Sequence, residues 1–173
     1  MREKTYGGAA ILLLGLAAAL AAGCRTSTTS GLPSHIRTVE VSLFQNKTMY
    51  KGIEGMVARY IIDRINADPA IQVVSGGGDA VISGEIAAVT RSTLRETTTN
   101  EPGTVLISIR AVYSFYDVKN RRFLIEDQEL SSSLTGLSPG IYEASRGAES
   151  TQGEQGAARA LAAEIVRKTI GKW

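Results

Sequence analysis

The sequence of 173 residues contains a single cysteine, Cys24, and a single histidine, His35. A disulfide needs two cysteines, and the usual zinc sites need three or four cysteine or histidine ligands, so neither is expected. With no second histidine a catalytic triad has no candidate residues, and no strand carries a pattern of paired carboxylates, so nucleophilic or acid–base catalysis is not expected. His35 is expected to be a solvated side chain. These absences indicate a protein that is not an enzyme and that holds no metal or other cofactor.

A strong charge of either sign is also lacking. The chain has 19 Lys+Arg against 17 Asp+Glu, for a formal net charge of +2. This balance gives no indication of nucleic acid as a partner. Without its first 23 residues the chain keeps about 150, which is enough for one compact domain and too few for two.

The N-terminus carries an apolar run over residues 9–22, preceded by the basic residues Arg2 and Lys4. This run is about 14 residues long, shorter than the roughly 20 that a membrane-spanning helix needs. Small residues follow it, as they do before a secretory cleavage site. Residues 1–23 are therefore predicted to be a signal peptide, with a retained membrane anchor as the alternative.

Leu20-Ala21-Ala22-Gly23-Cys24 resembles a lipobox, in which small residues precede a cysteine that is lipidated and becomes the mature N-terminus. Ala21 departs from the pattern, which usually has a larger aliphatic residue there. The resemblance implies a covalent diacylglycerol and an N-acyl lipid on Cys24, so that the chain reaches the membrane through a lipid anchor. Arg25 follows in place of the aspartate that retains lipoproteins in the inner membrane, which points to the outer membrane. Residues 24–34, rich in Thr, Ser and Gly, are predicted to be the lipidated N-terminus and a flexible tether.

Hydrophobic periodicity predicts the elements of the remaining domain, residues 35–173. An apolar stripe of helical spacing predicts a helix over residues 53–65, and a second helix is expected from Thr151, with Glu154 in a capping box, to Gly171. Strands are predicted over residues 36–44, 71–74, 80–97, 104–118 and 123–133. The glycines of residues 76–78 are read as a turn and not as a phosphate loop, because a strand follows them. Residues 45–48 are expected to break the first strand, and residues 134–149 to form a loop.

The second long strand alternates most regularly, so one of its faces is expected to be buried: Val105, Ile107, Ile109, Ala111, Tyr113 and Phe115. Two helices with apolar stripes need an apolar surface to cover. The predicted fold class is therefore α+β: a two-layer sandwich with two helices packed on one face of a mixed, mostly antiparallel four-stranded sheet.

One polar pattern suggests a binding site. Arg91, Thr93 and Arg95 alternate along one predicted strand, so both guanidinium groups are expected on the same side of the sheet. Arginines placed in this way can bind phosphates in bidentate fashion, such as those of a lipopolysaccharide. The alternative is an ordinary polar outer face.

The order and spacing of several segments resemble the LptE family, the lipoprotein half of the outer-membrane lipopolysaccharide translocon. The segments are the lipobox, Gly31-Leu32-Pro33, Ile36 to Val41, Phe44 to Thr48, the helix with Glu54, Asp79 to Ile86, and the terminal helix with Leu161 and Ile165. The resemblance implies a lipid-anchored, periplasm-facing protein of the outer membrane. It implies that the domain plugs and helps assemble the β-barrel of LptD and assists lipopolysaccharide transport to the cell surface.

Other functions remain open at the level of sequence. Exported lipoproteins that regulate peptidoglycan synthesis, or that form subunits of secretion pores, also begin with a strand, a Phe-x-Asn-x-Thr-like turn and a helix. They usually alternate strands and helices more regularly than residues 80–133 do here. A structural lipoprotein with an unknown partner is the third alternative.

Overall fold

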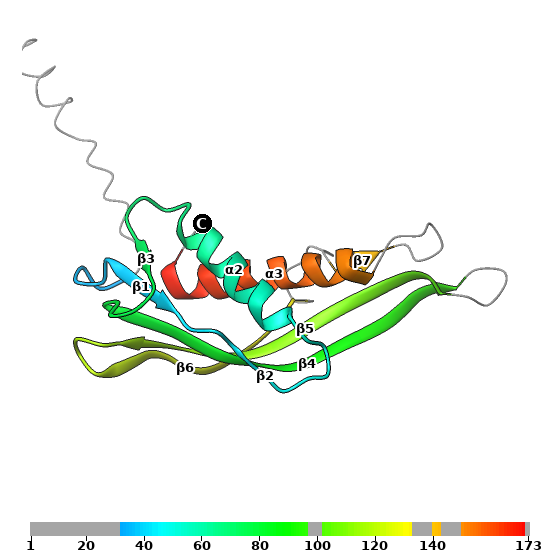
Figure 1. Cartoon of the computed structure of the whole chain (residues 1–173), viewed down its shortest axis with the longest axis horizontal. Helices are drawn as coiled ribbons and strands as arrows, with labels where there is room; N and C mark the ends of the chain where they lie inside the picture. Colours follow the sequence, from blue (N-terminus) through cyan, green and yellow to red (C-terminus); the bar gives the residue numbers. More distant parts are fainter. Residues whose placement is uncertain (1–31, 97–101, 133–139, 143–149, 172–173) are drawn as a thin grey trace, which may run out of the picture.

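The computed structural model describes residues 32–96, 102–132, 140–142 and 150–171. These residues form an α+β domain of two layers, with both helices on one face of a single sheet (Figure 1). The helices are α2 (Ile53–Ile65) and α3 (Ser150–Ile170). The strands are β1 (Thr38–Val41), β2 (Gln45–Asn46), β3 (Gln72–Val74), β4 (Ala80–Glu96), β5 (Pro102–Asp117), β6 (Arg122–Ser131) and β7 (Ile141–Tyr142).

The strand order is β3-β1-β4-β5-β6, with β2 paired to β4 and β7 paired to β5. Three pairings are parallel (β1–β3, β1–β4 and β2–β4) and three are antiparallel within the described residues. The predicted class and layers are confirmed, but the prediction of a four-stranded, mostly antiparallel sheet was wrong. The parallel part arises because α2 carries the chain back between β1 and β3, so β3 enters the sheet in the same direction as β1.

The extra strands are short and lie where no alternating pattern marks them. Residues 36–44 were expected to be one strand, but only Thr38–Val41 belong to β1, and the chain pairs again with β4 at Gln45–Asn46. Residues 45–48 therefore do not simply end the strand as predicted. Ile141–Tyr142, inside the expected loop, pair with β5 as β7, and most of that predicted loop lies outside the described residues.

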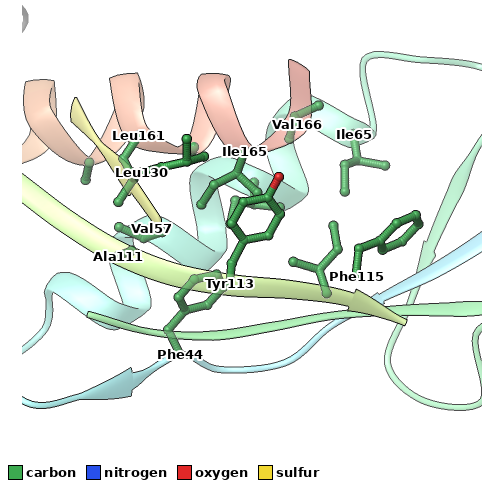
Figure 2. Close-up of a cluster of buried hydrophobic side chains, with 14 of the residues drawn as sticks. Phe44, Val57, Ile65, Ala111, Tyr113, Phe115, Leu130, Leu161, Ile165 and Val166 are labelled. Carbon is green, nitrogen blue, oxygen red and sulfur yellow. The ribbon is translucent and has the colours of Figure 1, made fainter. Parts of the chain in front are cut away.

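The core lies between the sheet and the two helices. All six residues of the predicted β5 stripe are buried, at 7% exposure or less, which confirms the predicted face. Figure 2 shows Tyr113 pointing from β5 toward α3, with Phe44 and Phe115 nearby. Each large apolar side chain buried in this way contributes about 1.5–3 kcal/mol to stability. Small residues on α3 allow it to lie close to the sheet and to α2: Ala157, Ala158 and Ala162.

The helix boundaries agree with their sequence signals. α2 spans the predicted residues 53–65, and its buried face is Ile53, Val57, Ala58, Ile61 and Ile65. α3 ends before Gly171, whose φ of 89° is a left-handed conformation that glycine adopts without strain. Among the described residues, neither helix is long and apolar enough to cross a membrane.

Gly84 is required on β4 by a close approach. A Cβ added there would lie 2.5 Å from the carbonyl oxygen of Val112 and 2.7 Å from the ring of Phe44. Both distances are too short for real Cβ contacts, so a side chain at residue 84 would displace the neighbouring strand or the Phe44 ring. The missing side chain thus lets Phe44 pack against the sheet from the segment between β1 and β2.

The β5–β6 pairing is interrupted twice. The register shifts between Tyr113 and Phe115 and again between Phe115 and Tyr116. Asp127 adopts a φ of 44°, and its backbone N–H donates to the hydroxyl of Ser114 over 2.9 Å. β6 is the last strand on this side of the described sheet, so the irregularity lies in an edge strand.

Cys24, the predicted signal peptide and most of the predicted tether lie outside the described residues. The last tether residues, 32–34, are described. Leu32 is partly buried against the hydrophobic core, and the N–H of Ile36 donates to the carbonyl of Pro33 over 3.0 Å. The chain therefore begins to pack on the domain before residue 35.

Candidate functional site

The segment between β2 and α2, residues 46–52, is held by the side chain of Asn46, and we call it the Asn46 loop. The Asn46 Nδ2 donates to the carbonyl oxygen of Tyr50 and to Oε2 of Glu54, both over 2.7 Å. Its Oδ1 accepts from the backbone N–H and from the hydroxyl of Thr48, both over 2.8 Å. One side-chain amide thus uses two donors and two acceptors to close the loop.

Glu54 completes the loop at the start of α2. The N-cap residue, Gly52, has no side chain, and Oε2 of Glu54 accepts its backbone N–H over 3.0 Å. A hydrogen bond from the backbone of Glu54 itself, followed by those from Asn46 and Gly52, holds the pKa of this carboxyl below its usual value, although burial opposes the shift. The carboxylate also lies in the first helical turn, where the helix dipole favours negative charge.

Arg91 connects the Asn46 loop to both β4 and α3. Its guanidinium lies 5.2 Å from the ring centroid of Tyr50, and its Nη2 donates to Oε1 of Glu154 over 2.8 Å. Glu154 was predicted to close a capping box with Thr151, and this was wrong, because α3 already begins at Ser150 and the carboxylate faces Arg91. Arg91 therefore braces three elements.

Arg91, Thr93 and Arg95 all lie on β4, and the side chain of Arg95 lies outside the part of the chain that the structure describes. Arg91 pairs with Ile107 and Thr93 with Val105, whereas the register shifts before Arg95, which pairs with Thr104. Directly paired residues of antiparallel strands share a face. Arg91 thus shares the helix-covered face with the buried Ile107. A role of Arg91 and Arg95 in phosphate binding remains a prediction.

The Asn46 loop presents one apolar side chain to solvent. Met49 is 94% exposed, the largest value among the exposed large hydrophobic residues. Lys47 and Lys51 flank it and are also exposed. The Nζ of Lys47 lies 3.9 Å from Oε2 of Glu85, a loose contact between two exposed side chains. The loop therefore holds a methionine between two cations.

A second polar cluster lies at the opposite end of β4 and β5. Asp117 is fully buried, and both of its carboxylate oxygens lie 3.0 Å from Nε2 of His35. Asn120 donates to Asp117 from its backbone N–H and from its side chain, over 3.1 and 2.8 Å. Burial alone would raise the pKa of Asp117, but the hydrogen bonds from His35 and Asn120 lower it to about 2. The prediction that His35 is simply solvated was wrong.

Asp79 ties the start of β1 to the same cluster. Its Oδ2 accepts from the N–H of Arg37, and from the N–H and hydroxyl of Thr38, over 2.8 to 3.0 Å. These bonds, led by that of Arg37, lower the pKa of Asp79, and the nearby His35 adds to the effect. The glycines before Asp79 form a turn into β4, as predicted. We call His35, Asp79, Asp117 and Asn120 the N-terminal clasp.

Sequence reasoning missed the key residues of both clusters, although each left a signal. Asp117 follows Phe115 by two positions, so it continues the buried stripe of β5 and needed a partner. Asn46 lies eight residues before Glu54 and was read only as a strand breaker. Asparagine and threonine side chains that bond the nearby backbone are typical of such ordered turns.

The helix-free face of the sheet carries a shallow groove of about 590 Å³ that is lined by both polar and apolar residues, Leu43 and Val112 among the latter. The side chains that line this groove include hydroxyl and carboxylate groups: Ser42, Ser83, Glu85, Ser114 and Asp127. No three side chains of the types that hold metal ions come together among the described residues.

The fold and these clusters define an α+β two-layer domain with an ordered surface loop. The chain belongs to the LptE family, since the family model described as Lipopolysaccharide-assembly matches residues 36–170. The family is one of non-enzymatic lipoproteins. No curated protein matches the sequence closely enough to count as a relative.

Solved structures share the fold at low sequence identity. Uncharacterized lipoprotein B from Nitrosomonas europaea is 14% identical, with a TM-score of 0.53 over 80% of this chain and 84% of that one. Protein XCC0632 from Xanthomonas campestris is 9% identical, with a TM-score of 0.51 over 78% of this chain and 84% of that one. At these identities the likeness shows the fold alone.

Proposed function

We propose that this chain is an outer-membrane lipoprotein that plugs and helps assemble an LptD-type β-barrel and assists lipopolysaccharide transport to the cell surface. The observation that carries the proposal is the extent of the family match. It runs from Ile36, the first fully described core residue, to Ile170, the last residue of α3. The match therefore includes both helices, every described strand, the Asn46 loop and all of the N-terminal clasp except His35.

The surface chemistry supports the same proposal. A plug inside a large barrel meets a polar, water-filled lumen. The helix-free face of the sheet has a groove with hydroxyl and carboxylate groups in its lining, and the side chains of β5 on this face alternate with the buried stripe and are half-buried or exposed. This face suits a wet lumen better than it suits lipid.

The membrane attachment rests on Cys24. We propose that the signal peptide is removed after Gly23 and that Cys24 carries the lipid, which places the domain on the periplasmic side of the outer membrane. Mass spectrometry of the mature chain tests this directly. Cys24→Ala is expected to release the protein from the membrane fraction, and a variant that stayed in that fraction with an intact N-terminus would indicate a retained anchor.

The partner is tested by affinity purification of the C-terminally tagged chain from detergent-solubilised outer membranes. We expect a large β-barrel protein to elute in a one-to-one ratio with the tagged chain. Elution of a peptidoglycan synthase, or of a ring of copies of this chain, would contradict the plug and favour the regulator or the pore subunit.

We further propose that Arg91 and Arg95 contribute to binding of a lipopolysaccharide phosphate. Among the residues that the structure describes, Arg91 donates only to Glu154, through one Nη, and a guanidinium has further N–H donors. Arg91→Ala combined with Arg95→Ala should weaken binding of a phosphorylated lipid in a pull-down from vesicles. Unchanged binding would leave Arg91 with its structural role at Tyr50 and Glu154 only.

A further inference from the structure

The most exposed large hydrophobic side chain lies on a tightly hydrogen-bonded loop. Met49 is 94% exposed, so nearly the whole thioether side chain faces water. The side chain therefore contributes almost no burial to the stability of its own domain. A polar residue at position 49 would leave the core undisturbed.

The backbone that exposes Met49 is ordered by hydrogen bonds. Asn46 makes four hydrogen bonds, three within the segment and one to Glu54, and Oε2 of Glu54 accepts the N–H of Gly52. The N–H of Tyr50 donates to the hydroxyl of Thr48 over 3.2 Å. The N–H of Lys47 donates to the carbonyl of Ile86 on β4 over 3.1 Å. The residues on both sides of Met49 are thus fixed before any partner binds.

The loop is also braced from outside. The Tyr50 ring is partly buried against the core and lies beneath the guanidinium of Arg91, which the carboxylate of Glu154 holds in turn. This chain of contacts fixes the loop on β4 and α3. A side chain presented by a preorganised backbone loses little conformational entropy on binding, which is how strong interface anchors are built.

We propose that Met49 is the anchor of a docking surface that inserts into an apolar socket rimmed by carboxylates on a partner protein. The rim follows from charge complementarity, because Lys47 and Lys51 flank the methionine and both are exposed. Methionine adapts its unbranched thioether to irregular apolar sockets, which suits this role. This inference rests on the proposed function, since the partner is then the wall of the LptD-type barrel.

A lipid surface fits the loop less well than a protein socket does. Peripheral membrane binding takes an extended apolar face or a second acyl chain. The Asn46 loop offers only Met49 between two lysines, whereas a single anchor seated in a protein socket can carry much of the binding free energy of an interface. Insertion into lipid is therefore an outcome that the experiment must be able to detect.

The test uses the full-length tagged chain in cells, with a photoreactive amino acid at position 49 and, as a control, at position 118. Val118 is also an exposed hydrophobic residue, at 44%, but it lies in the turn after β5 at the other end of the sheet. We expect position 49 to crosslink to the barrel protein at least tenfold more than position 118. Adducts with phospholipid alone, or equal crosslinking at both positions, would overturn the inference.

Substitutions give a second readout on the same complex. Met49→Asp should lower recovery of the barrel protein at least tenfold, while Met49→Leu and Val118→Asp retain it. Lys47→Glu with Lys51→Glu should also lower recovery, because the expected rim is acidic. The melting temperatures of the Met49 variants should match the wild type, since the side chain contacts little of its own domain.

The two proposals fail in different ways. A wild-type chain that captures no barrel protein would refute the plug itself. If the wild-type chain and the Met49→Asp variant captured the barrel protein equally well, only the docking surface would be refuted.

Discussion

The ring Nε2 of His35 lies 3.0 Å from both carboxylate oxygens of Asp117, although 82 positions separate the two residues in the chain. This contact joins the first residues of the domain to the last residue of β5. The side chain of Asp117 has no exposed surface, whereas 21% of the His35 side chain is exposed. The histidine therefore covers a buried carboxylate at the point where the chain enters the domain.

The first prediction concerns acid. Hydrogen bonds lower the pKa of Asp117 from 3.8 to about 2 in the folded chain, so the carboxyl binds its proton less readily than it does after unfolding. Its stabilisation is complete above about pH 4 and is lost as the pH falls through about 2. Asp117→Asn should make the free energy of unfolding fall less steeply between pH 4 and pH 2, as measured by urea denaturation at each pH.

Asp79 adds to the acid sensitivity in the same direction, because its pKa is also lowered in the folded chain. Some slope should therefore remain in the Asp117→Asn variant. Glu126→Gln changes an exposed carboxylate on β6 and serves as the control. If the free energy of unfolding of Asp117→Asn fell with pH as steeply as that of the wild type, protonation of Asp117 would not account for the loss of stability in acid.

The second prediction compares two glycines. Gly84→Ala should lower the free energy of unfolding by about 1–3 kcal/mol, because the new methyl group meets the Val112 carbonyl and the Phe44 ring. Gly55→Ala is the matched control, since Gly55 lies inside α2 with nothing within 4 Å of the added Cβ. Alanine there should stabilise the protein by about 0.5–1 kcal/mol. Thermal and urea unfolding measure both variants. Changes of the same sign in their free energies of unfolding would contradict the prediction.

The third prediction concerns a hydroxyl in the core. The Oη of Tyr113 is buried without a hydrogen-bond partner among the described residues, and the nearby Thr169 hydroxyl donates instead to the carbonyl of Ile165 over 2.6 Å. Burial, with the negative charge of Glu164, raises the pKa of Tyr113, and Thr169 opposes this only partly. Tyr113→Phe removes the unsatisfied group and should raise the free energy of unfolding by about 1 kcal/mol in urea. A loss of stability would point to a bound water as its partner.

The fourth prediction concerns the brace between β4 and α3. A double-mutant cycle with Arg91→Ala and Glu154→Ala should give a coupling free energy of about 0.5–1 kcal/mol, because 38% of the Arg91 side chain is exposed to screening solvent. Thr151→Ala is the control, because this substitution would lower the free energy of unfolding only if Thr151 formed a capping box with Glu154. A coupling near zero would show that the ion pair contributes nothing to the fold.

The elements with a regular hydrophobic period could be predicted from the sequence. The stripe of β5 and the bounds of α2 followed from spacing alone, because their side chains face one continuous apolar layer. β2 and β7 are two residues long, too short for any period to mark them. The pairing of Arg91 with Glu154 and the shift of register before Arg95 depend on contacts between distant segments, which local spacing does not encode.

The irregular pairing of β6 has a consequence for contacts between copies of the domain. A straight, unpaired strand at the end of a sheet is a template on which another chain can add, and such addition leads to aggregates. Here the left-handed Asp127 and two breaks in register spoil the regular row of N–H and C=O groups. A neighbouring copy of the domain therefore finds no regular row of backbone groups with which to pair on this side. The irregularity disfavours aggregation by addition of strands to β6.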